Sequence, residues 1–128
     1  MGAIREWAEA GPELSGEILD RPHLEHYTMY NQPLMVEVLG LFLAQLPVTL
    51  ELLDGAQTTA EWRFAAHSLK GAAASVGAPK LRSMALGLET FEFPGDPAVR
   101  LLRIQALRAA AAEFREAVRR SYPAVAET

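Results

Sequence analysis

The feature that most constrains the fold is the spacing of the apolar residues, which recur at three- and four-residue steps along most of the chain. This spacing places apolar side chains on one face of an α-helix, whereas a half-buried β-strand needs strict alternation. The longest such pattern begins after Asn31, a residue type that caps helices, and continues to Asp54 before Gly55. Pro47 lies inside it, and because the pattern continues beyond Pro47 we expect a kink there. The apolar positions are Met35, Val38, Leu39, Phe42, Leu46, Leu50 and Leu53.

Proline, glycine and capping residues divide the rest of the chain into further helical segments. Asp20 precedes Pro22 as a predicted cap, Thr58 and Glu61 have the spacing of a capping box, and Gly77 suits a left-handed helix end. Besides the segment up to Asp54, the predicted helices span residues 22–30, 58 or 59 to 77, and 97–122. A further helix is predicted to begin at Pro79, with its apolar stripe reaching Leu88, and Pro-Gly-Asp-Pro at 94–97 is a predicted break. The residues predicted to face inward in the later two are Leu81, Met84, Ala85, Leu88, Leu101, Ile104, Leu107, Ala111, Phe114 and Val118.

No segment shows the alternation of a strand, so the predicted fold class is all-α. The simplest arrangement is an antiparallel four-helix bundle with an additional short N-terminal helix. Residues 1–17 hold several glycines and little periodicity, so we expect a loosely ordered arm with one helical turn around Trp7. Residues 18–128 form the predicted bundle domain.

Composition narrows the function classes. The chain has 128 residues, half of them hydrophobic, which suits one soluble domain with a single core. A net charge of −4 argues against nucleic acid as a partner, and the absence of cysteine excludes disulfides and thiolate chemistry. Glu37 and Glu51 interrupt the most apolar stretch, and no signal peptide pattern precedes it, so we expect a cytoplasmic protein with no membrane contact.

The stretch AAHSLKGAAASVG, residues 65–77, surrounds His67 with unusually small side chains. At about 100° per residue, His67 lies nearly opposite the predicted core positions of its helix. Arg63, Lys70 and Phe64 lie on or beside the His67 face, and two small residues, Gly71 and Ala74, follow on it. This surface is a predicted docking patch around a nucleophile. The predicted core positions of this helix are Trp62, Ala65, Ala66, Leu69, Ala72, Ala73 and Val76.

Imidazole is a good nitrogen nucleophile near neutral pH, with an ordinary pKa of about 6.5. Attack by Nε2 requires the proton on Nδ1, and a neighbouring carboxylate would fix that tautomer. Glu89, at the edge of the following helix, is the candidate acceptor. The alternatives are ordinary ones: a surface histidine or a hydrogen-bonded core histidine at His67, and an ordinary surface acid at Glu89.

His67-Ser-Leu-Lys70-Gly71, followed by Ser-Val-Gly77, resembles the signature His-x-Leu-Lys-Gly-x-x-x-x-φ-Gly of histidine-containing phosphotransfer (HPt) domains. LGLFLAQLPVTLELL upstream and LRSMALGLE downstream are similar to the neighbouring helices of that family. The resemblance extends over residues 18 to 120. HPt domains are the shuttle modules of multistep phosphorelays and the phospho-accepting modules of chemotaxis kinases.

The resemblance implies a role for each matching residue. His67 would be phosphorylated, Lys70 would neutralise the phosphoryl oxygens, Gly71 would leave room for the partner, and Glu89 would accept the Nδ1 proton. The partner would be a response-regulator receiver domain or a histidine kinase. The receiver would supply its own aspartate and Mg²⁺, so this chain would need no cofactor and would carry phosphate without turnover of its own.

The main alternative is a helical module that docks a receiver or kinase without being phosphorylated. An enzyme with its own turnover is a third interpretation, but no second catalytic group converges on His67. The ordinary alternatives to the roles given above are a solvated helix charge at Lys70, tight helix packing at Gly71, and a Phe64 ring folded back under the N-terminal helix. His23 and His26 make at most half of a metal site, so no metal is predicted. We expect a monomer, since one core accounts for most apolar residues.

Overall fold

The structure is a computed structural model that describes residues 17–126. It is built from helices, with no strand among the residues described, so the all-α prediction is confirmed. The N-terminal arm predicted over residues 1–17, with its turn at Trp7, lies outside the described residues except for Glu17. The helices are α3 (Arg21–Tyr27), α4 (Gln32–Asp54), α5 (Thr59–Val76), α6 (Pro79–Glu89), α7 (Pro97–Ser121) and α8 (Pro123–Ala126).

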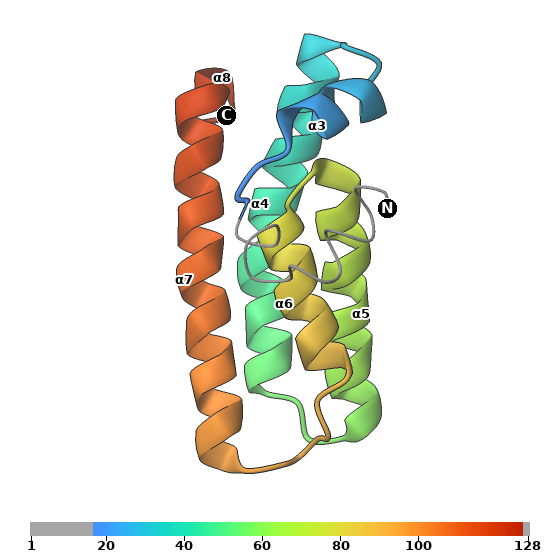
Figure 1. Cartoon of the computed structure of the whole chain (residues 1–128), viewed down its shortest axis with the longest axis vertical. Helices are drawn as coiled ribbons and strands as arrows, with labels where there is room; N and C mark the ends of the chain where they lie inside the picture. The colour runs from blue at the N-terminus through green and yellow to red at the C-terminus, as the bar shows by residue number, and fades with distance from the viewer. Residues whose placement is uncertain (1–16, 127–128) are drawn as a thin grey trace, which may run out of the picture.

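The long helices pack side by side, and Figure 1 shows α4, α5, α6 and α7 running alternately down and up. The α5 helix packs against α4 and α6, and α7 packs against the same two helices. The short α3 rests on α5, and α8 contacts α4 and α7. The core between them is made of leucine, alanine and aromatic side chains, with Trp62, Phe114 and Leu39 almost fully enclosed.

The predicted caps are present at the helix ends. The side chains of Asp20 and Asn31 accept hydrogen bonds from backbone N–H groups in the first turns of α3 and α4. Thr58 and Glu61 form the reciprocal capping box of α5. Gly77 ends α5 with a φ of 79°, and a Cβ there would lie 2.7 Å from the carbonyl oxygen of Asp20. Only glycine meets both conditions without strain.

Pro47 lies within α4, which continues on both sides of it. Because proline has no N–H, it cannot donate to the carbonyl of Leu43 four residues earlier. Arg115 of α7 donates to that carbonyl instead, over 3.3 Å. A neighbouring helix therefore supplies the hydrogen bond that the proline removes.

The helix at the N-terminal end is shorter than predicted. It stops at Tyr27 rather than Tyr30, because Thr28 caps it and the two residues that follow Thr28 do not have helical φ values. Met29 and Tyr30 follow with φ values of 54° and 59°. At the other end, Tyr122 caps α7, and α8 follows it without having been predicted.

Two residues predicted to face the core do not. Leu101 is 51% exposed, because it lies in the N-terminal part of α7, and the buried face of that helix begins only at Ile104. Ala72 is exposed because it borders a shallow groove between α4 and α5 that its small side chain does not fill. The remaining predicted core residues of α5 and α7 are buried.

By length and composition α4 is apolar enough to cross a membrane, a property that it shares with core helices of soluble proteins. One face of α4 fills the core, where Leu39, Leu46 and Leu53 are almost fully enclosed. Glu37 and Glu51 lie exposed on its other side. The apolar character of α4 is thus partly explained by packing within this chain.

Candidate functional site

The middle of α5 presents His67 to solvent, with 69% of its side chain exposed. Its helix is fixed on the opposite side by Trp62, Ala66 and Leu69, which are buried. Because these residues hold α5 in the core, the direction of His67 follows from its place in the helical repeat. The predicted orientation of the imidazole is therefore the one observed.

Glu89, the last residue of α6, lies beside the imidazole. Its Oε2 is 2.8 Å from Nδ1 of His67, although the two residues are 22 positions apart in the sequence. The contact depends on the close packing of α5 and α6, which Trp62 reinforces by donating from Nε1 to the Leu88 carbonyl over 2.7 Å. The structure thus brings together the two residues that the sequence analysis paired.

Lys70 contacts the same carboxyl group from the other side. Its Nζ lies 2.6 Å from Oε1 of Glu89, and about a quarter of each side chain is exposed. The ammonium of Lys70 and then the His67 contact hold the pKa of Glu89 below its usual value. This ion pair was not predicted, because nothing in the spacing of α5 alone shows that Lys70 faces Glu89.

The protonation of Glu89 determines the tautomer of His67. With a lowered pKa, Glu89 is a carboxylate at neutral pH and can only accept hydrogen bonds. The 2.8 Å contact therefore requires a hydrogen on Nδ1. In the neutral imidazole this leaves a lone pair on Nε2, on the other side of the ring from Glu89. The arrangement can act as a nitrogen nucleophile through Nε2.

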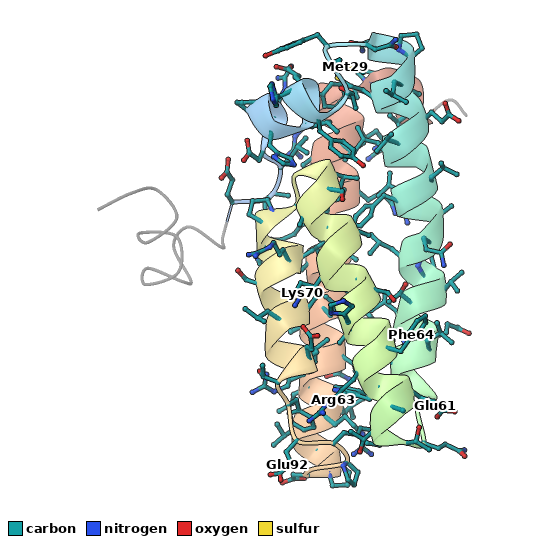
Figure 2. All side chains as sticks on the ribbon, turned by 90° about the vertical axis from the view of Figure 1, so that its right-hand side faces the viewer. Met29, Glu61, Arg63, Phe64, Lys70 and Glu92 are labelled. Atoms are coloured by element: carbon teal, nitrogen blue, oxygen red, sulfur yellow. The ribbon has the colours of Figure 1, made fainter. Side chains whose placement is uncertain are left out.

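The surface next to His67 has small residues on its C-terminal side and an exposed aromatic ring on the side toward α4. Nothing lies within 4 Å of the position that a Cβ would take at Gly71, and Ala74 is half-buried. Phe64 is 69% exposed, so it is not folded under the N-terminal helix, and it borders the groove with α4. Figure 2 shows Phe64 on the α4 side of α5 and Lys70 on the α6 side.

Arg63 is exposed one turn before His67 and makes no ion pair with any residue from 17 to 126. In Figure 2 it lies on the same side of α5 as Lys70. The imidazole is thus surrounded by one surface, which consists of Gly71 and Ala74, the exposed Phe64 ring and the Arg63 guanidinium.

The other histidines do not contribute to this site. Nε2 of His23 lies 3.1 Å from the Ser75 carbonyl, so α3 is held against the end of α5. Over the described part of the chain, no three histidine, cysteine, aspartate or glutamate side chains come close enough to hold a metal ion.

Comparison with known protein families identifies the domain type. The sequence model of the Hpt domain matches residues 37–120, which is more than half of the chain and includes α5, α6 and most of α4 and α7. The chain belongs to the Hpt domain family. An Hpt domain is a phosphotransfer module of two-component signalling, and such domains interact with receiver domains and histidine kinases. Two further comparisons, with curated proteins and with solved structures, found no match to the chain.

Proposed function

We propose that this Hpt domain is a phosphorelay carrier that accepts a phosphoryl group on Nε2 of His67 and passes it to a receiver. The donor is the phosphoaspartate of another receiver or a histidine kinase. The observation that carries the proposal is the contact between Nδ1 of His67 and the Glu89 carboxylate. It gives a solvent-exposed histidine a defined tautomer with Nε2 as its nucleophile.

The transfer step follows from this geometry. The lone pair of Nε2 attacks the phosphorus of the acyl phosphate, the N–P bond forms and the P–O bond to the aspartate breaks, so the electron pair leaves with the carboxylate. The Nδ1 proton stays on the ring, where Glu89 stabilises the positive charge that develops as Nε2 loses its lone pair. The reverse step transfers the group onward. The receiver supplies Mg²⁺, so this domain carries phosphate stoichiometrically and is not an enzyme.

Lys70 has a second role in this proposal. In the unphosphorylated protein its Nζ is paired with Oε1 of Glu89. A phosphoryl group on Nε2 adds negative charge to the same surface, and the flexible Lys70 side chain can turn to it. Arg63, Phe64, Gly71 and Ala74 form the surface that the receiver covers.

The proposal extends to the fold type, the oligomeric state and the location of the protein. We interpret the alternating α4, α5, α6 and α7 as the antiparallel four-helix bundle of the family, with α3 as the additional N-terminal helix. We further propose that the protein is a cytoplasmic monomer with no nucleic acid or membrane partner. The domain itself is proposed to span residues 18–128.

The test is incubation of the protein with a phosphorylated receiver, followed by analysis of the labelled product. Alkali-stable, acid-labile phosphate is expected on the wild type and not on His67→Gln. Equal labelling of both proteins contradicts the proposal. Receiver binding that persists in His67→Ala without any label transfer instead supports the docking module described above.

Gly71→Arg tests the docking surface separately. Since no atom lies near the Cβ position of Gly71, the variant is expected to fold and to bind the receiver more weakly. A melted circular dichroism spectrum for Gly71→Arg contradicts this interpretation and makes the glycine structural.

A further inference from the structure

An open cavity of about 460 Å³ lies between α4, α7 and α8, away from His67. At about 100° per residue, the α4 residues that line it point about 180° from those that line the groove with α5. Figure 1 shows α7 and α5 on opposite sides of α4, in agreement with the helix contacts. The cavity is therefore separate from the surface that we assign to the receiver.

Small residues of α4 leave this space open. Gly40 and Ala44 line the cavity and lie one helical turn apart. Gly40 is inside α4, where the backbone is helical and does not require glycine. A glycine in a helix interior is less stable than an alanine, so the helix loses stability at this position. Neither residue has a side chain large enough to fill the space between α4 and α7.

The wall of the cavity is apolar. Leu43 contributes to it from α4, Val118 from α7 and Val125 from α8. All three are buried side chains of the core. Small-molecule sites in proteins have volumes of roughly 300–1,000 Å³ and are mostly apolar, with a few polar groups that orient the ligand. The cavity has the volume and the wall of such a site.

Two arginines supply the polar groups. Arg115 and Arg119 line the cavity from α7, one turn apart. Arg115 donates from Nη2 to the Leu43 carbonyl, and Arg119 donates from Nη2 to Glu116. A guanidinium has five N–H donors, so within the described residues these contacts leave most of the donors for a ligand.

The charge at the cavity is positive. Arg115 forms no ion pair within residues 17–126, and Glu116 is shared between Arg119 and Arg120. No acidic side chain is among the described residues that line the cavity. A guanidinium can hold a carboxylate through two parallel hydrogen bonds. An apolar wall beside two arginines favours a ligand with an anionic head and an apolar chain.

We propose that the cavity between α4, α7 and α8 binds a small amphiphilic anion, a free carboxylate with the alkyl chain of a medium-chain fatty acid. The alkyl chain lies against Leu43, Val118 and Val125, and the carboxylate accepts hydrogen bonds from Arg115 and Arg119. Binding does not require phosphorylation of His67, because the cavity lies on the other side of α4.

The probe is sodium octanoate, added to the full chain and followed by nuclear magnetic resonance of the backbone amides. Shifts are expected at Gly40, Ala44 and Val118. Acetate, which lacks the alkyl chain, and octan-1-ol, which lacks the charge, are each expected to bind at least tenfold more weakly. Equal affinities for the three compounds, or octanoate shifts confined to α5 and α6, overturn the proposal.

Variants of the cavity make the test specific. Ala44→Leu fills the space from α4 and is expected to weaken octanoate binding at least tenfold. Its matched control is Ala109→Leu, because Ala109 is an exposed alanine of α7 that does not line the cavity. Arg119→Gln is expected to weaken binding about tenfold through the loss of a charged donor. Arg108→Gln, at an arginine of α7 outside the cavity, is expected to bind as the wild type does.

Other occupants give different results. Wild-type affinity in both Ala44→Leu and Arg119→Gln overturns the proposal, provided that thermal unfolding shows both variants to be folded. So does a wild-type dimer in sedimentation equilibrium that Ala44→Leu dissociates, since that result assigns the cavity to a second copy. Octanoate binding that is tenfold tighter in Glu127→Gln assigns the arginines to a carboxylate of this chain and also overturns it.

Two further measurements complete the test. Binding to vesicles of phosphatidylglycerol without any binding to octanoate overturns the proposal, because it assigns the arginines to a membrane surface rather than to a free molecule. His67→Gln is expected to bind octanoate with wild-type affinity. The outcome at the cavity is therefore independent of the outcome for the phosphorelay proposal, and loss of octanoate binding in His67→Gln contradicts a separate site.

Discussion

Glu89 is the residue on which the proposed chemistry depends. Its Oε2 lies 2.8 Å from Nδ1 of His67, and its Oε1 lies 2.6 Å from Nζ of Lys70. A carboxylate between two donors stays ionised over a wider pH range, and here the pKa of Glu89 is lowered. In the proposed mechanism, Glu89 therefore orients the imidazole of His67, and it pairs with the Lys70 ammonium in the unphosphorylated protein.

The first prediction concerns the pKa of Glu89. Lys70→Met removes the larger cause of its lowering, so the pKa is expected to rise toward the usual glutamate value. Nuclear magnetic resonance of the side-chain carboxyl over an acid titration measures both midpoints. Arg63→Met, which removes a cation that does not contact Glu89, is the control and is expected to leave the midpoint unchanged. An equal midpoint in wild type and Lys70→Met contradicts the ion pair.

The same pKa sets the direction of a stability change. Because the pKa of Glu89 is lower in the folded protein than its usual value, the carboxylate stabilises the fold above that usual value. This contribution is lost as the pH falls through the lowered folded pKa. Glu89→Gln is therefore expected to be less stable than the wild type at neutral pH and to converge with it in acid, as urea unfolding at both pH values can measure.

Sequence reasoning paired Glu89 with His67 because Glu89 lies at the edge of the following helix, and the family resemblance also implies an acceptor there. It did not find the Lys70 ion pair, because that contact exists only once α5 and α6 are packed. The residues that surround a site on their own helix follow from helical spacing. The ion pair between Lys70 and Glu89 joins two helices, and no pattern within either helix indicates it.

At the scale of the helices, capping residues predicted where helices begin and end more reliably than apolar spacing predicted which side chains are buried. Asp20, Asn31 and Thr58 accept hydrogen bonds from backbone N–H groups three residues later, so their roles could be predicted. Leu101 was assigned to the core because its spacing continues the apolar pattern of α7. The pattern gives a direction on the helix, but it does not say where the neighbouring helices end.

The second prediction concerns Pro47 and Arg115 in α4 and α7. Arg115→Met leaves the Leu43 carbonyl without its donor, which is expected to cost about 0.5–1.5 kcal/mol of unfolding free energy. In a Pro47→Ala background, the alanine N–H can donate to that carbonyl, so Arg115→Met should cost less. A double-mutant cycle by urea unfolding measures the coupling. Equal costs in both backgrounds contradict the compensation.

Over the whole molecule, Trp62 links the helix that carries His67 to the helix that carries Glu89. It is fully buried, donates to the Leu88 carbonyl, and its ring lies against Phe91 and Phe93. The separation of His67 and Glu89 thus depends on a contact in the core beneath them. The sequence predicted that Trp62 is buried, but not its hydrogen bond to α6.

The third prediction follows from this link. Trp62→Phe removes the donor to Leu88 and leaves unfilled volume, so the protein is expected to lose about 2–4 kcal/mol of stability. Phe64→Leu, a change at an exposed ring on the same helix, is expected to stay within about 0.5 kcal/mol of the wild type. Chemical denaturation of both variants makes the comparison. Similar losses contradict the assignment of Trp62 to the core contact and Phe64 to the surface.

The most direct test of the central claim is the position of the phosphoryl group on the imidazole. Nuclear magnetic resonance of ¹⁵N-histidine-labelled protein, phosphorylated by a receiver or kinase, distinguishes the two ring nitrogens of His67. The Glu89 contact predicts phosphorus on Nε2 and a proton on Nδ1. Phosphorus on Nδ1, or on a residue other than His67, would contradict the account.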